Sequence, residues 1–485
     1  MSMGLPQIIQ GGMGVAISDW RLARTVSQLG QLGVISGTGM SRVLVARLMD
    51  GDPEGHMRRA LAHFPFQDVA QQVTERFYVP GGKAPGVPYQ LLAPYTFRPS
   101  VFLDQMTVIS NFVEVFLARE GHNGLIGINL LEKVQFPTMA SLYGAMLAGV
   151  DYVLMGAGIP MQIAGLLDKY VNHEKTSYRI DVLGADKDDD FRLEFDPERL
   201  FPGIAERVGP LKRPNFLPII SSVVLAQALL KRSEGAINGF VVEGPLAGGH
   251  NAPPRGPLKL NDLGEPVYGE KDEVDLGKLA QLGLPFWLAG GFATAEKLQE
   301  ALANGAAGVQ VGTAFALCNE SGMELPTKQA LMARILRGEA VVHTSPLVSP
   351  TGFPFKVALL EDTLSDTEIY DARPRICDLG FLRSPYKLPN AENRREKIGY
   401  RCSAEPIDDF VRKGGDVEET AGRTCLCNTL SATAGYPQYR PKIDYLERPM
   451  VTAGDDLVNI ARFLKPGETT YSAKDVIDQL LPPLS

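Results

Sequence analysis

Cysteine is scarce in this chain, and the signals of a membrane or nucleic-acid partner are missing. Five cysteines among 485 residues argue against a disulfide framework and favour a reducing, cytoplasmic setting. The formal net charge of −8 lacks the basic balance of proteins that bind nucleic acid. No apolar run approaches the roughly 18 residues that cross a bilayer, and the N-terminus has no basic region followed by a long apolar segment. We therefore expect a cytoplasmic protein with no nucleic-acid partner and no membrane contact.

Common nucleotide-binding and catalytic motifs are also missing. The chain has neither a G-x-G-x-x-G followed by an acidic residue about 20 positions later nor a G-x-x-x-x-G-K-[ST] loop. A dinucleotide or triphosphate held in those ways is therefore not indicated. It also lacks G-x-S-x-G and H-E-x-x-H.

A zinc or iron–sulfur centre is not expected either. Four cysteines lie late in the chain, but only one pair is close, as C-x-C, unlike the C-x2–4-C pairs of most structural zinc sites. We expect buried, inert thiols and no metal; a weaker alternative is that the segment "RTCLCN" folds back over the site and lines it. The four are Cys377, Cys402, Cys425 and Cys427.

Glycine, in contrast, is abundant. It accounts for 50 of the 485 residues, which is above its usual share of about 7%. Many glycines follow short apolar runs, where a chain turns sharply or approaches a ligand closely. These runs are continuously apolar and rich in β-branched residues, which is typical of parallel strands buried on both faces. The eight candidate strands are 7–10, 33–36, 125–130, 152–155, 217–221, 239–243, 285–289 and 308–311.

Eight strands that alternate with helix-period segments predict an α/β fold, the (β/α)8 or TIM barrel. A doubly wound open sheet is the alternative, but it usually has five or six strands. The clearest barrel helices begin after Ser18, as N-cap, and cover 295–303. Two more are predicted late in the chain, over 455–464 and over 472–481 with Ser472 as N-cap.

Two long segments interrupt the alternation of strands and helices, and the alternation does not continue to the end of the chain. Segment 174–200 is expected to form an inserted hairpin, and 40–121 is long enough for extra helices. After residue 325 the alternation stops. We predict a barrel over residues 1–325 and a mixed, partly helical C-terminal module over 326–485 that packs on it.

The two last strand ends indicate a phosphate site. Gly290 and Gly291 follow the seventh strand, and Gly312 and Thr313 follow the eighth. In a barrel the reactive face lies at the carboxyl ends of the strands, and backbone N–H groups after the last two commonly hold a phosphate. Each glycine pair alone would be explained by a tight turn, but both together favour the phosphate site. A mononucleotide such as FMN fits this arrangement best.

One histidine of six lies at a predicted strand end among glycines, and it is His250. An imidazole there can serve as a base, an acid or a hydrogen-bond donor near neutral pH. The alternative is a histidine that closes a turn through backbone hydrogen bonds. The neighbouring phosphate site makes this alternative the less favoured of the two.

These stretches together resemble the nitronate monooxygenase family, formerly 2-nitropropane dioxygenases, which includes flavin-type enoyl-acyl-carrier-protein reductases. The resemblance rests on "PQIIQGGMG" (6–14), "GINL" (127–130), "AGGH" (247–250), "LAGGFAT" (288–294) and "GVQVGTAF" (308–315). It implies an FMN-binding (β/α)8 barrel in which His250 is the active-site base or hydrogen-bonding group. It implies FMN contacts from Gln10, Gly11, Gly12, Met13, Asn129, Glu243, Gly248 and Gly249, with the phosphate held by Gly290, Gly291, Gln310, Gly312 and Thr313.

The chain departs from the family pattern in two respects. The family usually reads Q-G-x-E-A-G-G-H, so Glu243 replaces a flavin-contacting Gln and Leu246 replaces a Glu. A carboxylate near the flavin would alter its electrostatics. The chain is also longer than simple members, and "SPTGFPFK" and "CLCN" resemble a longer branch with enoyl reductases of polyketide and fatty-acid synthesis.

The resemblance implies an FMN-dependent oxidoreductase that oxidises a nitronate or nitroalkane with O2. The first alternative is an NAD(P)H-dependent reductase of an enoyl thioester or quinone, with the loop 251–273 and the C-terminal module as docking surface for an acyl carrier protein. The second alternative is a non-catalytic flavin-binding partner protein. The substrate is a small molecule in the first two cases, and the oligomeric state, including a homo-oligomer, stays open.

Overall fold

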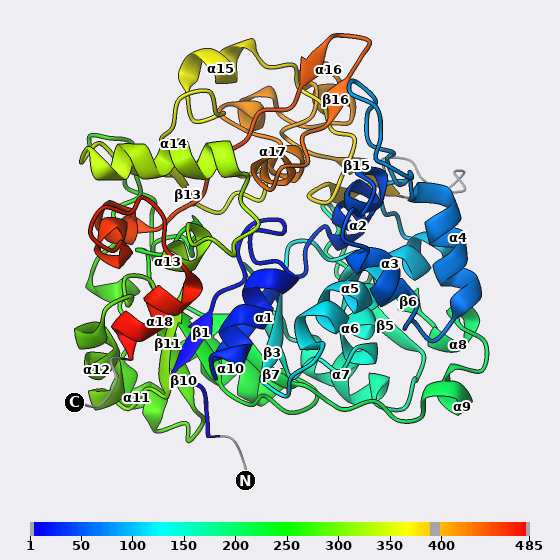
Figure 1. Ribbon diagram of the computed structural model, residues 1–485, viewed down its shortest axis with the longest axis horizontal. Helices are drawn as coiled ribbons and strands as arrows, with labels where there is room; N and C mark the ends of the chain where they lie inside the picture. The colour runs from blue at the N-terminus through cyan, green and yellow to red at the C-terminus, as the bar shows by residue number, and fades with distance from the viewer. Residues whose placement is uncertain (1–3, 389–397, 482–485) are drawn as a thin grey trace.

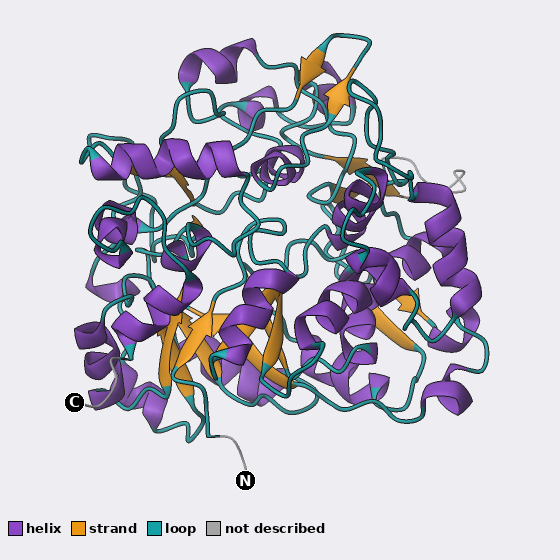
Figure 2. Cartoon of the chain, in the orientation of Figure 1, coloured by secondary structure: helices purple, strands orange, loops and turns teal. Residues whose placement is uncertain are grey.

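Eight parallel strands close into a barrel in the computed structural model of the protein, which describes residues 4–388 and 398–481 (Figures 1 and 2). The predicted (β/α)8 barrel is confirmed, and each predicted run supplies one strand. In order around the barrel these are β1 (Ile8–Gln10), β11 (Gly308–Val311), β10 (Phe286–Ala289), β8 (Phe240–Glu243), β7 (Asn215–Ile220), β4 (Tyr152–Gly156), β3 (Ile126–Leu131) and β2 (Leu32–Ser36).

Amphipathic helices cover the outside of the barrel. α1 (Trp20–Gln28) starts one residue later than predicted, because Asp19 and not Ser18 caps it, accepting from the backbone N–H groups of Arg21 and Leu22. Ser18 instead donates to the carbonyl of Gly11. The predicted helix over 295–303 is confirmed as α12. The other covering helices are α6 (Thr138–Leu147), α7 (Ile163–Tyr170), α10 (Val223–Arg232), α11 (Leu276–Ala280), α12 (Ala295–Ala303) and α13 (Thr313–Ala316).

The long second crossover holds the expected extra helices. One of them, α5, has the length and composition of a membrane-spanning helix, with a mean hydropathy of 1.4 in its most apolar window, although polar residues interrupt its sequence. Inside the structure 78% of that window is buried, and α5 packs against α1, α2 and α6. The crossover helices are α2 (Met40–Met49), α3 (His56–Leu61), α4 (Gln67–Phe77) and α5 (Val101–Arg119).

The predicted hairpin over 174–200 is present. Its strands β5 (Thr176–Arg179) and β6 (Arg192–Phe195) pair antiparallel, and the acidic stretch between them forms the tip. Two short helices, α8 (Pro197–Leu200) and α9 (Ile204–Val208), return the chain to the barrel.

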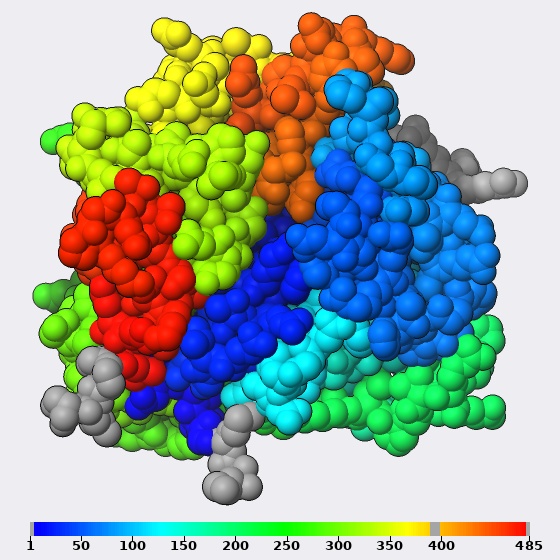
Figure 3. Space-filling view, in the orientation of Figure 1, coloured from blue at the N-terminus to red at the C-terminus, as the bar shows by residue number. Residues whose placement is uncertain are grey.

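The last third of the chain covers the carboxyl ends of the barrel strands. Figure 1 shows α15, α16 and α17 beyond that end of the barrel, and Figure 3 shows the last segment lying against the first. The domain boundary at 325/326 stays a prediction, since one apolar cluster joins barrel helices to Val451, Leu457 and Val476. The helices here are α14 (Leu325–Leu336), α15 (Thr367–Ala372), α16 (Ile407–Arg412), η3 (Val417–Thr420), α17 (Leu426–Thr433), η4 (Asp455–Phe463) and α18 (Ala473–Leu480).

Two of these helices were predicted. α18 is confirmed with Ser472 as its cap, in a capping box with Asp475. The segment predicted as a helix over 455–464 winds as the 3-10 helix η4 instead. Small strands complete the region: β12 (Val342–Ser345), β13 (Phe355–Ala358), β14 (Ser384–Lys387), β15 (Ile398–Arg401), β16 (Tyr439–Arg440) and β17 (Tyr445–Leu446).

Candidate active site

One residue from each barrel strand forms the floor of a cavity at the carboxyl ends of the strands. Side chains alternate between the two faces of a strand, and Ile9, Val34, Leu154, Leu217 and Val241 form the core inside the barrel. Residues two positions further along therefore face the same interior. The cavity measures about 260 Å³, close to the lower end of the ~300–1,000 Å³ of small-molecule sites. The eight floor residues are Gly11, Ser36, Asn129, Gly156, Ile219, Glu243, Ala289 and Gln310.

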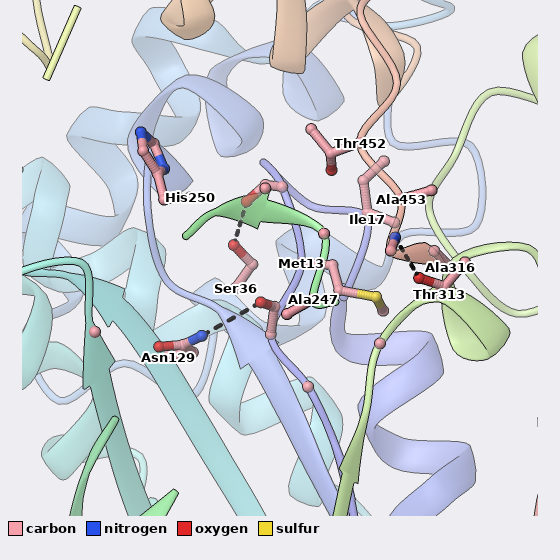
Figure 4. Close-up of a pocket in the computed structure, with 18 of the residues that line it drawn as sticks. Met13, Ile17, Ser36, Asn129, Ala247, His250, Thr313, Ala316, Thr452 and Ala453 are labelled. Atoms are coloured by element: carbon pink, nitrogen blue, oxygen red, sulfur yellow. Dashed lines mark hydrogen bonds between the residues drawn. The ribbon is translucent and has the colours of Figure 1, made fainter. Parts of the chain in front are cut away.

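Two amide oxygens of this floor are buried without a partner among the described residues. The Asn129 Oδ1 and the Gln310 Oε1 are buried without a hydrogen bond, although the Asn129 Nδ2 donates to the carbonyl of Gly12 at 3.3 Å (Figure 4). A buried polar atom without a partner costs roughly 1–3 kcal/mol. Both acceptors are therefore suited to a ligand that carries hydroxyl or N–H donors.

Glycine turns form one wall of the cavity, as the sequence indicated. Gly290 and Gly291 have φ values of 90° and 81°, a conformation that favours glycine. A side chain at Gly248 would place its Cβ 2.6 Å from the carbonyl carbon of Ala453. These glycines line the cavity, and the backbone N–H groups of such turns can hold an anion without a cationic side chain.

The roof of the cavity comes from the C-terminal region, and sequence reasoning largely missed it. The backbone N–H of Gly454 donates to the Thr313 Oγ1 at 2.8 Å, and that of Asp455 donates to the carbonyl of Leu246 at 3.0 Å. Only the "RTCLCN" alternative anticipated any of this, and Leu426 and Cys427 do line the cavity. The apolar roof residues are Phe381, Leu382, Leu426, Leu430 and Met450.

The prediction that His250 ends the sixth barrel strand is wrong. His250 lies in a separate small sheet. β8 ends at Glu243, and His250 belongs to β9 (Gly249–His250), which pairs antiparallel with β13. Its Nε2 lies 2.7 Å from the Oγ of Ser349, and its ring meets that of Phe355 edge to face, with centroids 4.7 Å apart. Burial lowers the pKa of His250 to about 4. The imidazole that lines the cavity is therefore neutral at pH 7.

Glu243 is the acidic residue of the floor. Its side chain makes no hydrogen bond or ion pair within the described part of the chain. Burial raises the pKa of Glu243 to about 8, because no cation offsets the loss of water around the carboxylate. The side chain at this position is therefore a neutral carboxylic acid at pH 7, where the sequence suggested a carboxylate.

Gln10 is the one predicted site residue that does not line the cavity. Because Ile9 faces the barrel interior, Gln10 faces outward. Its side-chain amide donates to Ser18, and its Oε1 accepts from the backbone N–H of Val34 at 3.0 Å. Gln10 therefore ties β1 to β2. The other twelve predicted cofactor residues and His250 all line the cavity.

The described lining of the cavity contains no lysine or arginine. Its ionisable side chains are Glu243, His250, Cys427 and Asp456, and Asp456 is paired with Arg462 at 2.6 Å. The thiol of Cys425 and burial raise the pKa of Cys427 well above its ordinary value, so the thiol stays protonated. Across the described residues, no cluster of three or more histidine, cysteine or acidic side chains could hold a metal ion.

Part of the barrel is similar in sequence to a known protein family. Residues 213–345, which run from β7 to β12, match the sequence model of the family described as nitronate monooxygenase. This region of the chain is therefore similar to that family. This region carries Glu243, His250 and both predicted phosphate turns, Gly290–Gly291 and Gly312–Thr313, and it extends to the strand before Ser349.

One curated protein is similar to part of this chain. The (3aS,4S,5R,7aS)-5-hydroxy-7a-methyl-1-oxo-octahydro-1H-indene-4-carboxyl-CoA dehydrogenase of Rhodococcus jostii (strain RHA1) is 32% identical over 136 residues. The match covers 28% of this chain and 34% of the relative, so it spans about a third of that protein.

Two solved structures are similar over most of their length. FabK from Thermotoga maritima is 16% identical with a TM-score of 0.45, covering 98% of this chain and 91% of that one. Nitroalkane oxidase from Streptomyces ansochromogenes is 14% identical with a TM-score of 0.47, covering 99% and 95%.

Proposed function

We propose that the protein is an FMN-dependent oxidoreductase that reduces the carbon–carbon double bond of an apolar enoyl thioester with NAD(P)H. The observation that carries this proposal is the contrast within one cavity. A polar floor and glycine turns belong to the barrel, and an apolar roof without lysine or arginine belongs to the C-terminal region.

Two features of the cavity fit FMN. The orphaned Asn129 Oδ1 and Gln310 Oε1 can accept hydrogen bonds from hydroxyl or ring N–H groups. The turns at Gly290–Gly291 and Gly312–Thr313 can hold the phosphate through backbone N–H groups, as in other barrels. FMN, when bound, would supply two-electron transfer between the nicotinamide and the acyl substrate.

A nitronate is a weaker match to this cavity than a neutral acyl group. A buried anion needs a cation or several donors to offset its lost hydration. Most side chains of the roof are apolar, among them Phe381, Leu430 and Met450, and its hydroxyl donors are limited to Thr433 and Thr452. The roof can instead bury the hydrocarbon part of an acyl chain, at about 25 cal/mol per Å² of apolar surface. The partial match to a dehydrogenase that is named for a carboxyl-CoA compound supports a thioester substrate.

In the reaction NAD(P)H is oxidised and loses a hydride. The double bond is reduced, gaining that hydride at Cβ and a water-derived proton at Cα, which gives the saturated thioester. We assign to His250 the hydrogen bond to the thioester carbonyl oxygen. A neutral imidazole N–H polarises that oxygen without burying a charge. Ser349, 2.7 Å from the Nε2, fixes the orientation of the ring.

The thioester carrier is coenzyme A or an acyl carrier protein. The loop 251–273, which follows His250, exposes Leu258, Leu260 and Leu263, the last with 74% of its surface accessible. We propose this loop as the surface that meets the carrier.

Anaerobic reduction of the purified protein tests the function. NADH or NADPH should bleach the bound flavin, and an enoyl thioester such as trans-2-octenoyl-CoA should restore its colour with formation of octanoyl-CoA. Bleaching without reoxidation by any enoyl thioester would contradict the substrate. Purified protein that cannot take up FMN would contradict the cofactor and favour a non-catalytic protein.

Nitronate oxidation is the second candidate, because residues 213–345 match the family of that name. Oxygen uptake with propionate-3-nitronate, compared with the same concentration of free FMN, tests it. Uptake well above free FMN, without bleaching by NAD(P)H, would select this activity over the reductase.

A further inference from the structure

Glu243 stands apart from the other polar residues of the cavity floor. It follows Val241 by two positions and therefore points along the barrel interior. Ala289, its register partner on β10, is small, and Ile219, which lies on the neighbouring strand β7 in register with Val241, is apolar. Glu243 thus lies in a mostly apolar part of the floor with neither a cation nor a hydrogen-bond partner among the described residues.

Two other ionisable groups near Glu243 have pKa values outside the neutral range. Burial lowers the pKa of His250 to about 4 and raises that of Tyr268, which senses the charge of Glu243, to about 12. Lys356 is bound to the Asp455 carboxylate at 2.5 Å and to the carbonyl of Pro245 at 2.8 Å.

Two further ionisable side chains line the cavity. Asp456 is paired with Arg462, and Cys427 keeps its proton. Of Glu243, His250 and Cys427, only Glu243 has a pKa shifted into the range from pH 6 to 10. Burial places its pKa at about 8 within that window.

We propose that Glu243, as an uncharged carboxylic acid on the barrel floor, donates a hydrogen bond to the bound flavin, and that its ionisation lowers the reduction potential of that flavin. The inference rests on the proposed function only in requiring that FMN binds. It does not depend on the substrate.

The direction follows from electrostatics. Reduction adds electrons to the flavin, and a nearby neutral donor favours that added charge, whereas a carboxylate opposes it. The reduced state in turn makes ionisation of Glu243 harder. The potential of the native protein should therefore fall more steeply with pH above about 8 than the flavin alone requires.

Potentiometric titration of the FMN-loaded protein between pH 6 and 10 tests this inference, with Glu243→Gln as the key variant. An amide can still donate a hydrogen bond but cannot ionise. The two proteins should have similar potentials at pH 6–7, and the native protein should have the lower potential at pH 9–10. The absorbance spectrum of oxidised flavin should show an inflection near pH 8 that Glu243→Gln lacks.

Asp104 provides the matched control. It is a buried carboxyl group on α5, away from the cavity lining, and burial raises its pKa to about 7. Asp104→Asn should keep the pH dependence of the native flavin. Identical profiles in native protein and Glu243→Gln would overturn the inference while leaving the enoyl reductase intact. Loss of the inflection in Asp104→Asn as well would also overturn it, because a general conformational change would then be the cause.

The outcomes separate this inference from the proposed function. A protein with the Glu243-dependent inflection but no enoyl reduction would retain the role of Glu243 and refute the substrate. A protein that takes up no FMN would refute both.

Discussion

The backbone N–H of Gly454 donates to the side-chain oxygen of Thr313 at 2.8 Å, joining the C-terminal region to the end of the last barrel strand. Thr313 also belongs to the predicted phosphate turn. The segment that closes the cavity is thus attached to the residues that would hold the cofactor. Cofactor binding and the position of the roof are expected to be coupled.

Gly248→Ala should weaken FMN binding through this coupling. The new Cβ would lie 2.6 Å from the carbonyl carbon of Ala453 and 2.7 Å from the nitrogen of Gly454, so the roof segment must move. Overpacking of this kind costs about 1–3 kcal/mol, or roughly 10- to 100-fold in the dissociation constant of FMN. Flavin fluorescence measures that constant.

Gly244→Ala is the control for this change. Its Cβ would meet the carbonyl oxygen of Ala289 at 3.7 Å, an ordinary contact. FMN affinity should be close to native. Equal affinities in native protein and Gly248→Ala would show that the roof does not constrain the cofactor turn.

Ser349→Ala should lower kcat/KM about tenfold, because a hydrogen bond of roughly 0.5–1.5 kcal/mol that orients His250 is lost. Its Oγ lies 2.7 Å from the His250 Nε2 and 2.8 Å from the Thr351 Oγ1. Ser349→Thr, which keeps the hydroxyl, should recover part of the loss. A drop in kcat/KM shared equally by both variants would indicate a packing role and not orientation of the imidazole.

The barrel could be predicted because its signals are local. Each strand is a continuous apolar run, and strand parity explains both the inward Glu243 and the outward Gln10. Side chains alternate along a strand, so an inward Ile9 already implies that Gln10 faces away from the cavity. The glycine turns were also readable, since close approach and positive φ both favour glycine.

The roof could not be predicted, because long-range packing creates it. Phe381, Leu430 and Met450 are widely separated in sequence, and no local pattern links them to one cavity. The two-residue strand of His250 depends on pairing with β13 about a hundred residues later. Ser349 likewise acquires its role only from that pairing.

Leu430→Ala should enlarge the cavity below the roof and weaken the preference of the enzyme for longer acyl chains. Loss of apolar contact costs about 1–3 kcal/mol, so KM for a medium-chain enoyl-CoA should rise roughly 10-fold or more, whereas crotonyl-CoA should change little. Leu230→Ala on α10, where the leucine is exposed, is the control. Equal changes in KM for both chain lengths would place the acyl chain outside the roof.

Glu243→Gln should stabilise the protein, and more so at alkaline pH. Burial raises the folded-state pKa of Glu243 from 4.5 to about 8, so between these values the folded state binds more protons than the unfolded state. The free energy of unfolding contributed by Glu243 therefore falls as pH rises from about 4.5 to 8 and levels off above it. Removing the ionisable group should recover on the order of a few kcal/mol at pH 8.5 and little at pH 5. Urea unfolding of the flavin-free native protein and variant at both pH values measures the difference, and an equal difference at pH 5 and 8.5 would show that Glu243 has an ordinary pKa.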